Sequence, residues 1–114
     1  MKILILEDSA DRIKTFQKNL IGHDVYFFDN VRNAIDAVNL MGPFDVYFLD
    51  HDLDDRIFVD SNEPNTGYQF AKFLAQKKVT GQIIIHTLNP AGQKNMKDVL
   101  PHAEVVPFML LFKK

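Results

Sequence analysis

The residues most able to do chemistry in this chain are two groups of acids, each of which follows a short apolar run. Glu7 and Asp8 follow the run at residues 2–6. A set of aspartates follows the run at residues 46–49: Asp50, Asp52, Asp54 and Asp55. Short apolar runs that end in Asp are typical of buried strands. Buried strands belong to parallel sheets, in which ligands bind beyond the carboxyl ends of the strands. The sequence therefore predicts that both acidic groups lie in one crevice.

Clustered carboxylates in such a crevice predict a site for a hard divalent cation. Mg²⁺ prefers oxygen ligands and takes one or two carboxylates together with the phosphate of a substrate. We expect Asp8 and Asp50 to bind Mg²⁺ or Mn²⁺, with Glu7 holding a metal-bound water. Such an ion neutralises a phosphodiester and lowers the pKa of a bound water. The alternative is that the aspartates form only a solvated acidic loop.

Histidines lie beside the same strand ends. His86 closes the apolar run QIII at residues 82–85, and His51 directly follows Asp50. Imidazole transfers protons near neutral pH, which makes His86 a candidate acid or base, with His51 assisting. The alternative is that each histidine is a hydrogen-bonded structural residue. Strand alternation also predicts that His86 and Thr87 point to opposite faces unless the strand ends there.

Two polar residues after the same run are candidates for phosphate binding. Thr87 and Asn89 could donate hydrogen bonds to phosphate oxygens, helped by the amino end of a helix that begins at Pro90. Asn89 is also well placed to cap that helix, and these two roles are compatible.

Helices alternate with strands along the chain. Apolar stripes and capping residues predict helices that begin at Ser9, Asn30, Asn65 or Thr66, and Asn89. Strands are predicted at residues 2–6, 24–28, 46–50, 82–87 and 103–106, and residues 52–64 form a polar, acidic loop. This alternation predicts a single domain over residues 1–114 with a three-layer, doubly wound α/β fold and a parallel sheet.

Composition narrows the possible functions. The chain has 114 residues, of which 46% are hydrophobic and 25% charged, as in ordinary globular proteins. Its net charge of -2 gives no electrostatic basis for binding duplex DNA. The absence of cysteine excludes thiol catalysis and disulfides. Without a signal peptide or a long apolar run we expect no membrane association and a cytoplasmic location.

The order of these features resembles the response-regulator receiver domain. The shared features are acids after the first strand, Asp50 ending the third, Thr87 ending the fourth, and Pro107-Phe108 after the fifth. The resemblance covers nearly the whole chain and implies a flavodoxin-like sheet of five strands in the order 2-1-3-4-5. It implies that Asp50 is the phosphoacceptor and Thr87 the switch hydroxyl. It also implies a metal site built from carboxylates and one backbone carbonyl: Glu7, Asp8, Asp50 and the carbonyl of Asp52.

Two departures argue against an ordinary signalling receiver. Val106 stands where receivers have the lysine that reads the phosphorylated state. Only a short tail follows Pro107, where receivers have a fifth helix for output and dimerisation. The fifth helix is therefore expected to be missing or truncated.

Three segments resemble the receiver variant described as the cyclic-phosphate-processing receiver domain: LDHDL at residues 49–53, the loop at residues 60–67, and IHTLNPAG at residues 85–92. That family is predicted to act on cyclic phosphate ends in RNA repair or nucleotide signalling. The resemblance implies a metal-dependent phosphoesterase whose ligand is a small phosphorylated molecule or an RNA end. In this chemistry His86 protonates the leaving oxygen, or activates water, as the cyclic ester opens.

Two other functions stay open. In the first, Asp50 is a nucleophile that takes phosphate from a kinase or a small donor and forms an aspartyl-phosphate, as in receivers. In the second, the domain is a catalytically silent binding module.

Overall fold

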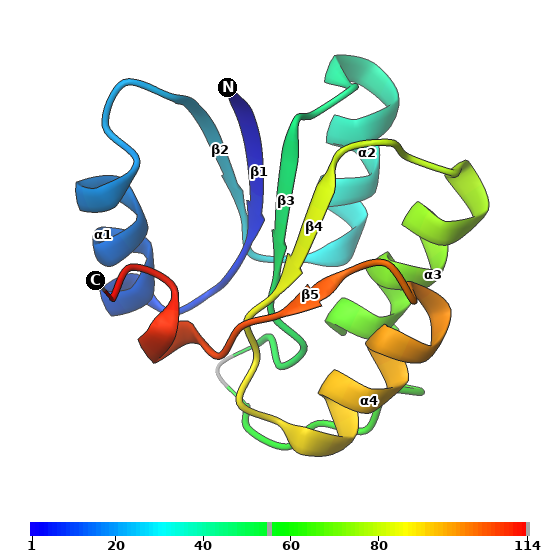
Figure 1. Ribbon diagram of the computed structural model, residues 1–114. Coiled ribbons are helices and arrows are strands. Elements are labelled where there is room, and N and C mark those ends of the chain that lie inside the picture. Colours follow the sequence, from blue (N-terminus) through cyan, green and yellow to red (C-terminus); the bar gives the residue numbers. More distant parts are fainter. Residues whose placement is uncertain (55, 114) are drawn as a thin grey trace.

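Five parallel strands form one sheet in the order β2-β1-β3-β4-β5, as predicted. The computed structural model describes residues 1–54 and 56–113, so Asp55 of the acidic set lies outside the described residues. The strands are β1 (Lys2–Leu6), β2 (Asp24–Phe28), β3 (Val46–Leu49), β4 (Gln82–Ile85) and β5 (Glu104–Val105). Because all five are parallel, their carboxyl ends emerge at one edge of the sheet (Figure 1).

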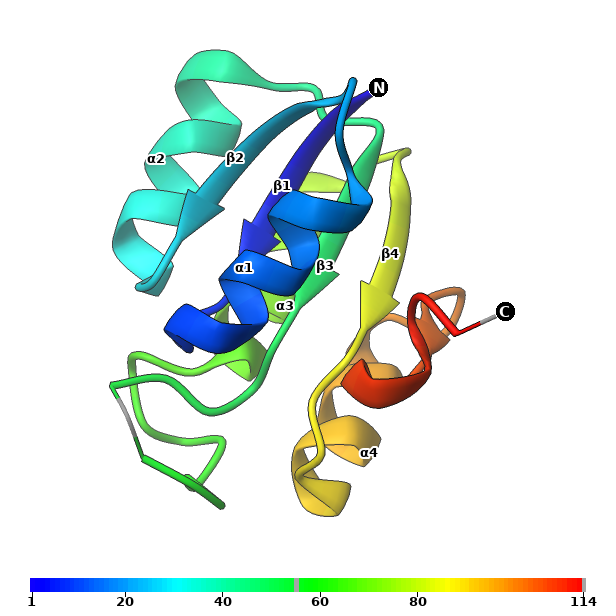
Figure 2. The ribbon, with the colours of Figure 1, turned by 90° about the vertical axis from the view of Figure 1, so that its left-hand side faces the viewer.

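Four α-helices cover the sheet on its two faces. They are α1 (Ala10–Asn19), α2 (Val31–Met41), α3 (Gly67–Lys77) and α4 (Pro90–Val99). α1 and the C-terminal tail lie on one face, and α2, α3 and α4 lie on the other, which gives the predicted three layers (Figures 1 and 2). No helix in the described part of the chain has the length and apolar character needed to cross a membrane.

Capping side chains set the starts of three helices. The side chains of Ser9, Asn30 and Asn89 each accept a hydrogen bond from the backbone N–H three residues later. Thr66 begins α3 differently, because its hydroxyl donates to carbonyl groups of the preceding loop.

The core alternates along each strand. Ile3, Ile5 and Phe48 face α1, whereas Leu4 and Leu49 face the other three helices. Successive residues of a strand point to opposite faces, so a strand without polar residues requires cover on both sides.

The C-terminal tail covers the sheet where a fifth α-helix is missing. Among the described residues β5 is followed by a single 3-10 turn, η1 (Phe108–Leu110), and by no fifth α-helix, as predicted. The rings of Phe108 and Phe112 pack edge-on against buried Phe16, each with its centroid 5.7 Å away. The tail thus completes the apolar layer between the sheet and α1.

The acidic loop closes on itself at the carboxyl end of β3. The backbone N–H of Gly67 donates to the carbonyl of His51 at 2.9 Å. A Cβ atom at Gly67 would lie 1.7 Å from the carbonyl oxygen of Asp50, so only glycine fits there. The loop therefore begins and ends at the same place, beside Asp50.

Candidate active site

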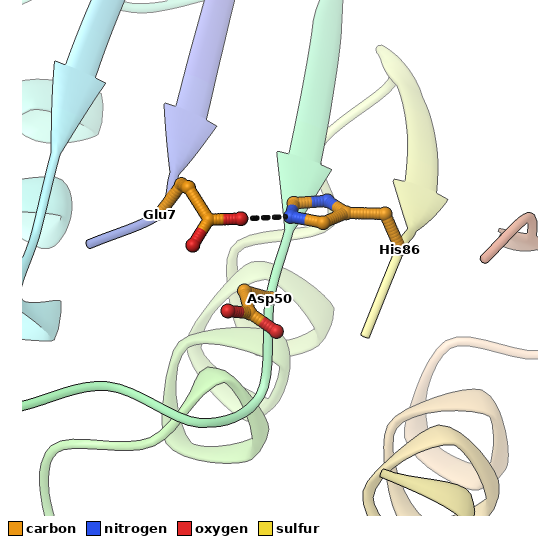
Figure 3. Close-up of side chains that lie close together, drawn as sticks. All are labelled: Glu7, Asp50 and His86. Carbon is orange, nitrogen blue, oxygen red and sulfur yellow. Dashed lines mark hydrogen bonds and ion pairs between the residues drawn. The ribbon is translucent and has the colours of Figure 1, made fainter. Parts of the chain in front are cut away.

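Glu7, Asp50 and His86 meet at the carboxyl edge of the sheet (Figure 3). Each is the first residue after its strand, and its backbone N–H still donates to a carbonyl of the neighbouring strand. All three side chains are buried. One ligand atom from each lies within 4.8 Å of the others. The sheet thus brings these groups together, although Glu7 and His86 are 79 residues apart in the chain.

Glu7 and His86 form a buried hydrogen-bonded pair. Nε2 of His86 lies 2.9 Å from Oε1 of Glu7. The other carboxylate oxygen of Glu7 accepts the backbone N–H groups of Asp8 and Ser9, each at 3.1 Å. Burial acts to raise the pKa of Glu7, but these hydrogen bonds and the charge of Arg12 hold it below its usual value. Burial lowers the pKa of His86, and this outweighs the opposing effect of Glu7. A neutral imidazole therefore donates to an ionised Glu7.

Asp50 has the opposite shift. Burial and the negative charge of Glu7 raise the pKa of Asp50 to about 8. The guanidinium of Arg12, 3.9 Å from Oδ2, and the backbone N–H of His51, 2.9 Å from Oδ1, offset only part of this. The carboxyl group consequently holds a proton at neutral pH when no cation is bound.

A cavity of about 340 Å³ opens at this edge. It is lined by every predicted site residue except the two histidines: Glu7, Asp8, Asp50, Asp52, Thr87 and Asn89. The sequence-based prediction of the site did not include the other lining residues: Ser9, Arg12, Arg56, Ile57, Phe58 and Leu88. Arg12 does carry a signal, because it lies in the first turn of the helix that follows the acids. Ile57 and Phe58 also carry a signal, because they are large apolar residues in an acidic loop.

His86 lies behind the carboxylates rather than in the cavity. Its ring packs against the rings of Phe16 and Phe108, with centroids 5.4 and 6.2 Å away. Its Nδ1 atom is buried and has no hydrogen-bond partner among the described residues. Thr87 lines the cavity and His86 does not, which agrees with the prediction that the two side chains point to opposite faces. The catalytic role of His86 stays a prediction, and in this geometry its contact with the site is Glu7.

His51 holds the acidic loop against α4. Its Nδ1 and Nε2 atoms lie 2.8 Å from Oδ1 of Asp52 and from Oγ of Ser61, respectively. A Cβ atom at Gly92 of α4 would lie 2.5 Å from the ring. These are the contacts of a residue with a structural role, and its assistance to catalysis stays a prediction.

Asp52 and Asn89 are joined by their side chains. The side-chain NH₂ group of Asn89 donates to Asp52 Oδ1 at 3.0 Å. The side-chain oxygen of Asn89 caps α4 by accepting a hydrogen bond from the backbone N–H of Gly92. Burial acts to raise the pKa of Asp52, but hydrogen bonds from His51, Asn89 and two backbone N–H groups lower it more. The helix-cap interpretation of Asn89 is thus confirmed. The Asp52 carboxylate is thus engaged by hydrogen bonds within the loop and from Asn89, and the metal contact of its backbone carbonyl stays a prediction.

The donor set suits a hard divalent cation. Glu7 and Asp50 are buried carboxylates close together, and Asp8 lines the same cavity. A cation between them would remove the repulsion that raises the pKa of Asp50. Oxygen ligands of this kind are those that Mg²⁺ and Mn²⁺ prefer.

The sequence was compared with models of known protein families. The model of one family, the cyclic-phosphate processing receiver domain, matches residues 2–102. The chain belongs to this family. No curated protein matches this receiver.

Several solved structures with the same fold are receivers or response regulators. TrrA from Thermotoga maritima, solved in complex with Mg²⁺-BeF, has a TM-score of 0.70 and 20% identity over 94% of this chain and 86% of its own. CheY4 from Vibrio cholerae has a TM-score of 0.69 and 20% identity over 93% and 84%. The receiver domain of a LuxO repressor protein from Vibrio parahaemolyticus has a TM-score of 0.67 and 19% identity over 92% and 75%. At these identities the similarity shows the fold.

Proposed function

We propose that this receiver is a divalent-metal-dependent phosphoesterase that opens a cyclic phosphate on a nucleotide or an RNA end. The observation that carries the proposal is the buried Glu7 and Asp50 pair, backed by His86, in a cavity that also presents Thr87 and Arg12.

The acidic residues would hold the ion. Asp8 and Asp50 would bind Mg²⁺ or Mn²⁺, with Glu7 beside it and the carbonyl of Asp52 as a further contact. When bound, the ion supplies charge neutralisation of the phosphate and a water of lowered pKa. Asp50 gives up its proton on binding, so binding is linked to pH.

The remaining residues would bind substrate and move protons. The Thr87 hydroxyl and the Arg12 guanidinium bind non-bridging phosphate oxygens. Glu7, kept ionised by His86, accepts the proton of the attacking water and returns it to the leaving oxygen. His86 acts in this transfer through Glu7.

Turnover of 2′,3′-cyclic and 3′,5′-cyclic nucleotides with Mg²⁺ or Mn²⁺ tests the proposal. We expect hydrolysis by the wild-type protein, its loss in Asp50→Asn, and a decrease of about 100-fold or more in kcat in His86→Ala. His102→Ala is the matched control, because His102 is exposed and outside the cavity. Absence of turnover on every cyclic ester with both ions would overturn the proposal.

A second candidate function is phosphate acceptance by Asp50. The observation in its favour is that Asp50 and Thr87 line one cavity on a fold shared with TrrA, which was solved with Mg²⁺-BeF. A mass gain of one phosphoryl group from acetyl phosphate, prevented by Asp50→Asn, would support it. A wild-type protein that hydrolyses cyclic esters without this gain would exclude it.

A further inference from the structure

Three of the side chains that line the cavity are both apolar and exposed. Ile57, Phe58 and Leu88 line it, yet 79%, 69% and 41% of their surfaces are exposed. Single exposed apolar residues are common on proteins, whereas a group of them around one opening indicates a binding surface. We call these three residues the apolar rim.

The backbone fixes Phe58 in this outward position. Its φ angle is 53°, a left-handed conformation that is rare for residues with large side chains. The N–H groups of Phe58 and buried Val59 donate to the two oxygens of Asp52 at 2.8 and 3.1 Å. Asp52 is held in turn by His51 and Asn89. Unfavourable backbone conformations persist where the surroundings enforce them, often at ligand sites.

The cavity has charged groups beside the apolar rim. Arg12 and Arg56 line the cavity together with the acids, and the Arg56 guanidinium lies 3.6 Å from the Glu63 carboxylate. A ligand that fits all of these groups has an anionic end for the metal and Arg12, and a planar apolar end for the rim. A nucleotide has both ends, whereas a small cyclic phosphate would leave the rim in water.

We propose that Phe58, flanked by Ile57 and Leu88, is a stacking platform for the base of a nucleotide whose phosphate lies at Asp50. This inference rests on the proposed function for the position of the phosphate. Aromatic side chains bind bases of every sequence by stacking, so the platform selects nucleotides over other phosphate esters without selecting one base. Arg56 lies beside the platform and adds a guanidinium that can contact the base or its phosphate.

Binding of ring-opened products tests the platform without requiring turnover. The dissociation constants of adenosine 3′-monophosphate and of glycerol 2-phosphate would be measured by calorimetry in Mg²⁺. We expect Phe58→Ala to weaken binding of the adenosine ligand by about tenfold or more. It should leave the affinity for glycerol 2-phosphate unchanged, because that ligand has no base.

Two control variants separate stacking from a change in the loop. Phe58→Tyr retains the ring and should bind both ligands as the wild type does. Met109→Ala removes an exposed apolar side chain that does not line the cavity, and it should change neither constant. Equal weakening of both ligands by Phe58→Ala, no weakening of either, or no binding of adenosine 3′-monophosphate by the wild type would each overturn the platform.

The outcome is separable from that of the proposed function. A selective loss in Phe58→Ala supports the platform even if no cyclic ester is hydrolysed. Turnover of cyclic esters without a selective loss supports the phosphoesterase and removes the platform.

Discussion

Glu7 and Asp50 are buried carboxyl groups whose pKa values shift in opposite directions. Burial opposes ionisation of both, but Glu7 has His86 and two backbone N–H groups as donors. Asp50 has only one backbone donor and a more distant guanidinium, and the negative charge of Glu7 disfavours its ionisation. The pair therefore carries about one negative charge at neutral pH until a cation binds.

Replacement of Asp50 should change how stability depends on pH. Its pKa rises to about 8 in the metal-free native state, from about 4 when unfolded. Between these pH values Asp50 is protonated in the native state and ionised in the unfolded state. The stability that this proton contributes is therefore full below about pH 4 and is lost as pH rises through about 8. Asp50→Asn should therefore raise Tm in EDTA more at pH 9 than at pH 5, by about 4 °C or more. Thermal melts at both pH values measure this.

Mg²⁺ provides the control for that experiment. Saturating Mg²⁺ should stabilise the wild type and should stabilise Asp50→Asn less, because a ligand has been removed. An Asp50→Asn effect that is the same at pH 5 and pH 9 in EDTA would contradict the raised pKa.

The acids of the site could be predicted from the sequence because each directly follows a strand, and parallel strands end together. The Glu7 and His86 contact could not, because it depends on how Phe16 and Phe108 pack around the imidazole. Sequence alternation placed His86 and Thr87 on opposite faces, but it did not show which of them would line the cavity.

At the scale of elements, the acidic loop is positioned by its contact with α4. His51 fills the space above Gly92, and it hydrogen-bonds Asp52 and Ser61 at either end of the loop. The loop carries Phe58, so this contact also positions the apolar rim.

Gly92→Ala should therefore destabilise the protein, although alanine favours helices by about 1 kcal/mol over glycine. The new Cβ would lie 2.5 Å from Cγ of His51, and such overpacking costs about 1–3 kcal/mol. We expect a lower urea midpoint with an unchanged m-value. In a His51→Ala background the same change should cost less, because the two ring contacts are removed and only the 2.9 Å contact with Cβ of residue 51 persists. An equal cost in both backgrounds would show that His51 is not the cause.

Helix starts were predictable because Ser9, Asn30 and Asn89 cap their own helices, which is a local interaction. The conformation of the loop was not predictable. It has no periodicity, and its hydrogen bonds run to Asn89 and Asn95, which lie far along the chain.

At the scale of the whole molecule, the tail replaces a helix as cover for one face of the sheet. Phe16 is the centre of this layer, and its ring contacts those of Phe27, Phe48, Phe108 and Phe112. The predicted lack of a fifth α-helix agrees with the 3-10 turn that follows β5 among the described residues. The packing of the segment after β5 on Phe16 could not be predicted, because a few apolar residues have no pattern that identifies their contacts.

Phe16→Ala should cost about 3–5 kcal/mol, as expected for a fully buried phenylalanine. The loss should also lower the affinity for Mg²⁺, since the His86 ring packs on Phe16 and orients Glu7. Urea unfolding and metal titration measure the two effects. Phe58→Ala is the matched control and should change stability by no more than about 0.5 kcal/mol, because that ring is exposed. A similar cost for both variants would contradict the central role of Phe16.

The closure of the acidic loop at Gly67 has a consequence for how this family can diversify. Because the segment leaves β3 at Asp50 and His51 and enters α3 at Gly67, against the same two residues, it can be lengthened, shortened or exchanged without moving the strands. The loop residues that line the cavity, Ile57 and Phe58 among them, can therefore be exchanged without moving the carboxylates that the sheet places at its edge.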